Sequence, residues 1–98
     1  MAYVSISTWQ ANSDDAGSDA QWAIAQEKYI PANKALGAIQ TMMIDTGEGG
    51  FSVVNVYPDE ATRDAAAEKL AALRAEAGEE VGATLTGMVT GEVRASSG

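Results

Sequence analysis

Apolar and polar residues alternate in four short stretches of the chain that predict β-strands. β-Branched and aromatic residues are frequent in 2–9, 38–45, 51–57 and 83–93, and glycine or polar residues bound each stretch. In the first stretch, Val4 and Ile6 point to one face of a sheet, and Tyr3 and Trp9 point to the other. Residues 46–50 predict a hairpin turn between the second and third strands, because their glycines tolerate positive φ.

Helical periodicity separates these strands in two places. The first predicted helix begins at Ser18 or Asp19 and runs to about Ile30, and Pro31 predicts a kink or a second short turn that ends at Gly37. The second begins at 58–60, runs to about Ala77, and is stopped by Gly78 or Gly82. The expected inner sides are Trp22, Ala23, Gln26, Tyr29 and Ile30 for the first helix, and Thr62, Ala66, Leu70, Leu73 and Ala77 for the second.

The resulting order is β-α-β-β-α-β, the split β-α-β pattern of the ferredoxin-like fold. The two halves echo each other: residues 37–41 resemble 82–86 at the entry to the strand that follows each helix. Right-handed crossovers place both helices on the same face of a four-stranded antiparallel sheet. With 98 residues the chain is long enough for one domain, which we expect to span 1–95, with 96–98 as a frayed tail.

Both faces of such a sheet are too apolar for water, because neither set of predicted strand residues is charged. Helices on one side leave the other face bare, and strands with one solvated face normally alternate apolar and polar residues. A two-fold sheet-to-sheet homodimer is the simplest cover. The alternative is that one face is polar enough to remain exposed to solvent, because it carries Ser5, Ser7, Thr84, Thr86 and Thr90. The pattern leaves open which face meets the helices.

Charge and missing residue types exclude several functions. Six basic and 14 acidic residues give a net charge of −8, which disfavours nucleic acid and anionic membranes as partners. No cysteine and no histidine are present, so thiol nucleophiles, zinc fingers and histidine-based triads are excluded. Residues 12–17 resemble a calcium loop but lack its fifth and twelfth ligands. We therefore expect no metal and no cofactor.

The start of the chain has no export signal, and no stretch is apolar enough to span a membrane, so the expected location is cytoplasmic.

One group of side chains suits a flat small molecule. Aromatic rings supply contact area, and an amide orients the ligand. The candidate ligand-binding residues are Trp9, Trp22, Tyr29, Asn33, Asn55 and Tyr57. The alternative is an aromatic core with hydrogen-bonded amides. No catalytic residue is assigned.

The chain resembles the dimeric α+β barrel superfamily, which includes the antibiotic-biosynthesis-monooxygenase-like proteins. The resemblance is carried by residues 3–7, 28–32, 35–38 and 49–59, the last reading Gly-Gly-Phe-Ser-Val-Val-Asn-Val-Tyr-Pro-Asp. It implies a homodimer whose two sheets pack into a barrel, with a small cleft between each sheet and its helices. Haem-degrading members generally use an axial histidine, which this chain lacks.

Three hypotheses follow from the pattern and the resemblance together. The leading one is a dimeric α+β barrel protein that binds a small apolar or aromatic ligand between sheet and helices. The second is a cofactor-independent monooxygenase that acts on a polyphenolic or quinone-type substrate. The third is a protein-interaction module. Whether the chain is an enzyme is left open.

Overall fold

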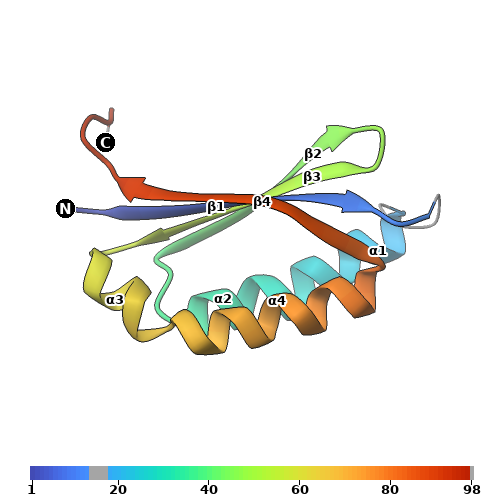
Figure 1. Cartoon of the computed structure of the whole chain (residues 1–98), viewed down its shortest axis with the longest axis horizontal. Coiled ribbons are helices and arrows are strands. Elements are labelled where there is room, and N and C mark those ends of the chain that lie inside the picture. The colour runs from blue at the N-terminus through green and yellow to red at the C-terminus, as the bar shows by residue number, and fades with distance from the viewer. Residues whose placement is uncertain (14–17, 98) are drawn as a thin grey trace.

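The computed structural model describes residues 1–13 and 18–97. The elements are β1 (Tyr3–Ala11), α1 (Asp19–Ile24), the π-helical turn η1 (Ala25–Tyr29), α2 (Ile30–Ala35), β2 (Gln40–Gly47), β3 (Gly50–Tyr57), α3 (Glu60–Ala65), α4 (Ala67–Val81) and β4 (Ala83–Glu92). The strands form one antiparallel sheet in the order β2-β3-β1-β4, and the helices lie on one side of it (Figure 1). The predicted ferredoxin-like fold is confirmed. The calcium-loop interpretation falls on residues that include 14–17, which lie outside the described ranges.

The predicted second short turn after Pro31 is confirmed: the first helical stretch continues as α2 through Pro31 to Ala35. A π turn widens the helix just before the proline, and Pro31 then occupies the first turn of α2, where a missing N–H is tolerated. The buried residues of this stretch are Ala25, Tyr29 and Asn33. The predicted inner side is thus confirmed for Tyr29 and wrong for Ala23 and Gln26, which are exposed, while Trp22 and Ile30 are partly buried.

The second helical stretch begins at Asp59, whose carboxylate accepts a hydrogen bond of 2.8 Å from the backbone N–H of Thr62. It is interrupted at Ala66 and continues to Val81. Gly82, with φ of 68°, ends it, so Gly82 and not Gly78 is the stop. Ala66 and Leu70 are buried, and the other three residues of the predicted stripe are partly buried, which confirms this helix face.

The helices cover the face of the sheet that carries Ser5, Ser7, Trp9, Val53, Asn55 and Tyr57, all of them buried. Ser7 is satisfied there because its hydroxyl accepts a hydrogen bond of 2.9 Å from the indole N–H of Trp9. The alternative in which serines and threonines keep the bare face hydrated is therefore wrong for Ser5, Ser7 and Thr90, since Thr90 pairs with Ser5 and shares its face. The covered face thus buries serine and asparagine side chains beside its aromatic residues.

The open face of the sheet is apolar across its full width. Met42 is opposite Val54, Val54 is opposite Ile6, and Ile6 is opposite Val89, so one row crosses all four strands. Val89 is 65% exposed, Ile44 44% and Met42 40%. The strand residues paired on this side carry no charge. This surface is the kind that soluble proteins usually cover.

The core consists of two small clusters between the sheet and the helices. One holds Ala38, Tyr57, Ala66 and Leu70, and the other is centred on Trp9, Val53 and Ala83. Ala38 and Ala83 each follow a glycine with positive φ, which supports the predicted echo between the two halves. None of the helices in the described ranges is long and apolar enough to cross a membrane.

Candidate functional site

A cleft of about 720 Å³ lies between α4 and β4. It forms because α4 contributes the small residues Ala71, Ala75 and Gly78 to its lining, besides Arg74 and Glu79. The other side is β4, an edge strand without a neighbour on its outer side. Large residues are thus left uncovered: Leu85 is 40% exposed and Met88 43%. Clefts of this volume are typical of small-molecule sites.

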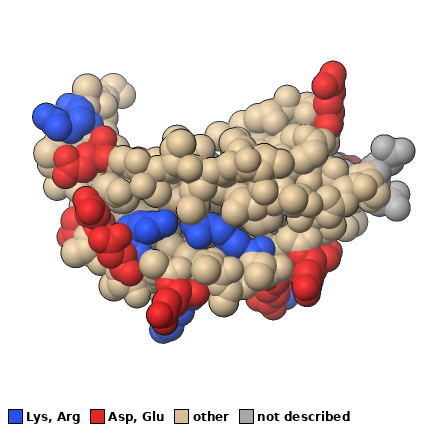
Figure 2. All heavy atoms as spheres, viewed as in Figure 1, with Lys and Arg blue, Asp and Glu red and all other residues tan. Residues whose placement is uncertain are grey.

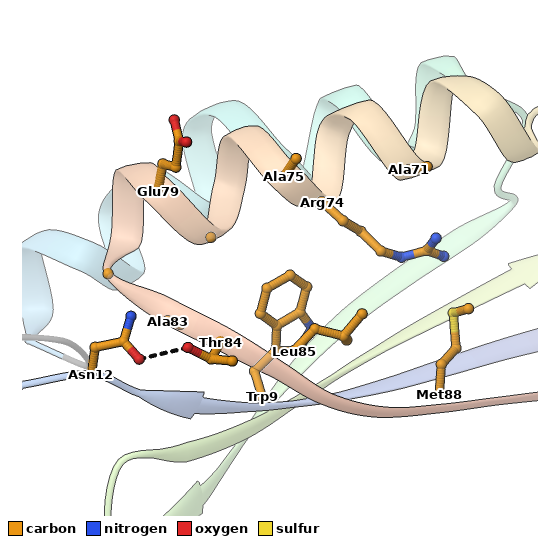
Figure 3. A pocket seen from close by; sticks show the side chains of 12 residues that line it. Trp9, Asn12, Ala71, Arg74, Ala75, Glu79, Ala83, Thr84, Leu85 and Met88 are labelled. Carbon is orange, nitrogen blue, oxygen red and sulfur yellow. Dashed lines mark hydrogen bonds between the residues drawn. The ribbon is translucent and has the colours of Figure 1, made fainter.

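Trp9 forms the back of this cleft, and Arg74 projects into it from α4 (Figure 3). The Trp9 ring is held in place by stacking on Phe51, with ring centroids 5.9 Å apart. At one end, the Thr84 hydroxyl donates a hydrogen bond of 2.7 Å to the side-chain oxygen of Asn12. The cleft therefore combines an immobilised aromatic wall, two exposed apolar side chains and one cation.

A second, much smaller cavity of about 40 Å³ lies deeper between the sheet and the helices. Four of the six predicted ligand-binding residues line it: Trp9, Tyr29, Asn33 and Asn55. Trp9 and Arg74 line both this cavity and the cleft. A cavity of this size has room for little more than a water molecule. Of the six, only Trp9 lines the large cleft.

The two amides belong to a buried hydrogen-bond chain. The Asn33 amide donates to the backbone carbonyl of Tyr29 at 2.7 Å, and the Asn55 amide donates to the side-chain oxygen of Asn33 at 3.1 Å. The hydroxyl of Thr41 donates to the Asn55 side-chain oxygen at 2.7 Å. Partners within the protein thus satisfy the amide oxygens, and the chain ties α2 to β2 and β3.

Trp22 and Tyr57 lie apart from these four residues. Trp22 packs edge-on against Phe51 and lines a surface hollow beside β2 with Thr41 and Met42. Tyr57 is 0% exposed and packs in the cluster with Ala38 and Leu70. Its hydroxyl is buried and has no hydrogen-bond partner in 1–13 and 18–97.

Arg74 is the functional residue that sequence reasoning missed. Burial is the main cause that lowers its pKa, and the nearby guanidinium of Arg63 lowers it further. Burial likewise raises the pKa of Tyr57, while the charges of Arg74 and Arg63 act in the opposite direction. A signal was present, because Arg74 follows Leu70 by four residues and so lies beside the buried stripe of α4.

Tyr29 belongs to a separate contact between the first helical stretch and α4. Its hydroxyl donates to the carboxylate of Glu80, which also accepts from the Lys28 ammonium at 2.8 Å. Burial and this hydrogen bond raise the pKa of Tyr29 to about 12. Hydrogen bonds from Lys28 and Tyr29 lower the pKa of Glu80.

Acidic side chains do not gather into a metal-binding group anywhere in the ranges described. The lining of the cleft therefore offers apolar binding surface, the guanidinium of Arg74 and the carboxylate of Glu79.

Comparisons with known proteins show the fold. No protein-family model matches the chain, and no curated protein matches it. One similar solved structure is a dimeric ferredoxin-like protein from an uncultured marine organism, with a TM-score of 0.69 and 18% sequence identity. The likeness covers 97% of this chain and 97% of that one. The chain thus has a complete ferredoxin-like fold, and Figure 3 shows the cleft that this fold leaves between its last helix and its last strand.

Proposed function

We propose that this protein binds a small molecule with an apolar or aromatic body in the cleft between α4 and β4. The observation that carries the proposal is the lining: Trp9 forms a wall, and Leu85 and Met88 stay exposed opposite a helix surface of alanine and glycine. Covering large exposed apolar side chains beside an aromatic wall removes them from water, which favours ligand binding. Tyr29, Asn33 and Asn55 would support Trp9 from below.

A substitution that fills the cleft tests this function. N-Phenyl-1-naphthylamine is a neutral aromatic probe whose fluorescence rises in an apolar site. We expect the wild-type protein to bind it and Ala75→Trp to weaken binding at least tenfold, since Ala75 lines the cleft and is exposed. Ala72→Trp is the matched control, because Ala72 is exposed on the same helix and is not a lining residue of the cleft. Equal binding by both variants would contradict the proposal.

We further propose that two copies associate through the open faces of their sheets. The row Met42, Val54, Ile6 and Val89 supports this, since a two-fold axis would pack it against its own copy. Stable homodimers bury about 1,200 Å² or more in total, and a four-stranded face is of that order. The solved relative is itself described as dimeric, which adds support. This arrangement would form a dimeric α+β barrel, the architecture of the superfamily that the sequence resembles.

A cofactor-independent monooxygenase is the second candidate function. The placement of Trp9 beside Arg74 favours it, because a guanidinium next to an aromatic wall can stabilise the anion of a polyphenol. Oxygen uptake with a panel of hydroxylated polycyclic aromatics tests it. Binding of these compounds without oxygen uptake would contradict the monooxygenase and would still support the binding function.

A protein-interaction module remains the third candidate, and a stable heteromeric complex in place of the homodimer would favour it. The cytoplasmic location stays a prediction, which cell fractionation would check.

A further inference from the structure

The distribution of charge sets the cleft apart from the rest of the molecule. The chain has 14 acidic and only six basic residues. Figure 2 shows basic atoms along the hollow between the helix layer and the sheet, whereas acidic atoms lie on the outer side of the helices and at the ends of the molecule. A small anion that approaches this hollow therefore meets positive charge on an otherwise acidic surface.

Arg74 supplies charge to this hollow without a partner of its own. Among the residues that the structure describes, it forms no ion pair and no hydrogen bond, whereas Lys28 contacts both Glu76 and Glu80. Glu79 is the acidic residue of the lining, but Figure 3 shows its carboxylate turned away from the cleft while Arg74 points into it. The guanidinium is thus free to bind a carboxylate in a bidentate manner.

The surroundings of Arg74 favour the binding of an anion beside its guanidinium. Arg63 lies near enough for like-charge repulsion, and its Nε atom is buried without a hydrogen-bond partner in the described part of the chain. The Tyr57 hydroxyl beside them is also buried and unpartnered within those ranges. Arg63 pairs with Asp64 at 3.7 Å, so Arg74 is the guanidinium of the cleft lining that has no carboxylate partner in the described chain.

We propose that the ligand of this cleft is a small organic anion whose carboxylate binds the guanidinium of Arg74 and whose apolar body lies on Trp9, Leu85 and Met88. This inference rests on the proposed binding function and adds to it the chemical class of the ligand. Neutral aromatics would bind by the same apolar surface but without the charged contact.

Two probes with the same rings separate the two proposals. N-Phenyl-1-naphthylamine is neutral, and 8-anilinonaphthalene-1-sulfonate adds one anionic group to the same skeleton. At low salt we expect the wild-type protein to bind the sulfonate roughly tenfold to a hundredfold more tightly, as a charge-assisted hydrogen bond predicts. We expect Arg74→Met to abolish this preference, so that the ratio of the two affinities falls close to one. Arg74→Lys, which retains the charge without the planar fork, should give an intermediate preference.

Lys69→Met is the matched control, because Lys69 is exposed on the same helix outside the cleft lining and its loss changes the net charge equally. It should leave the preference intact. Equal affinity of the wild-type protein for both probes, or a preference that survives Arg74→Met, would overturn the anion assignment alone. Failure of both probes to bind would overturn the binding function as well. Thermal unfolding of each variant verifies that it is folded.

Discussion

At the scale of single residues, the structure contains one phenol whose ionisation is linked to folding. Tyr29 is 2% exposed and donates to Glu80, and its pKa is raised to about 12. In the unfolded chain a tyrosine titrates near pH 10. The stabilising contribution of Tyr29 is therefore fully present below about pH 10 and is lost as the pH rises towards 12.

Alkaline unfolding of a Tyr29→Phe variant tests this linkage. Phenylalanine cannot ionise, so the variant should lose less stability between about pH 10 and pH 12 than the wild-type protein loses. Chemical denaturation at a series of pH values measures the two slopes. Identical slopes would mean that Tyr29 ionises in the folded state as easily as in the unfolded state.

Arg74 gives a second prediction at this scale. A partly buried cation without an anion costs free energy, so Arg74→Met should stabilise the ligand-free protein by about 1 kcal/mol. Lys69→Met, at an exposed position of the same helix, should change the stability by less than about 0.5 kcal/mol. Denaturant unfolding without ligand compares them. A clear loss of stability in Arg74→Met would show that packing of its hydrocarbon stem outweighs the charge.

At the scale of elements, a glycine with positive φ stands at each of the two junctions between a helix and the strand that follows it. Gly37 has φ of 112°, and a Cβ there would lie 2.7 Å from the Cγ2 methyl of Thr62. Gly82 has φ of 68°, with nothing within 4 Å. Gly37→Ala should destabilise the protein by about 2–3 kcal/mol and Gly82→Ala by about 1 kcal/mol.

A Thr62→Ser background separates contact from backbone strain. Serine removes the methyl and keeps the hydroxyl that donates to Asp59 at 2.7 Å. Gly37→Ala should therefore be milder in this background, but still more costly than Gly82→Ala. Thermal unfolding of the four variants provides the comparison, and an equal cost in both backgrounds would assign the whole effect to φ.

Sequence patterns predicted the elements better than their inward sides. Periodicity identified all four strands and the stripe around Leu70, because these depend on local alternation. The inward side of the first helix was predicted only in part: Tyr29 is buried as expected, whereas Ala23 and Gln26 are exposed. A π turn from Ala25 to Tyr29 departs from the regular spacing that periodicity assumes. Asn33, a candidate ligand-binding residue, forms hydrogen bonds to partners within the protein as a buried member of the hydrogen-bond chain.

The cleft itself could not be predicted from the sequence, because it arises from tertiary structure. Small residues on α4 become a cavity wall only when β4 takes the edge position beside β1. Trp9 was identified because large aromatics are conspicuous, whereas Leu85, Met88 and Arg74 gain significance only from their exposure around a shared space.

At the scale of the whole molecule, the open face of the sheet determines the expected assembly. Val89→Lys places a charge in the apolar row, while Thr90→Lys places the same charge on the next residue of β4, whose side chain points to the other face. We expect Val89→Lys to weaken the homodimer at least tenfold and Thr90→Lys to leave it intact. Light scattering over a concentration series measures both. A wild-type protein that stays monomeric at high concentration would contradict this assembly.

The most direct test of the proposed site is nuclear magnetic resonance of the ¹⁵N-labelled wild-type protein during titration with 8-anilinonaphthalene-1-sulfonate. Our account predicts shifts concentrated in the backbone amides of 71–79 and 83–88 and in the indole N–H of Trp9, which surround the cleft. Shifts centred on the row of Val54 and Val89, or an unchanged spectrum, would contradict it.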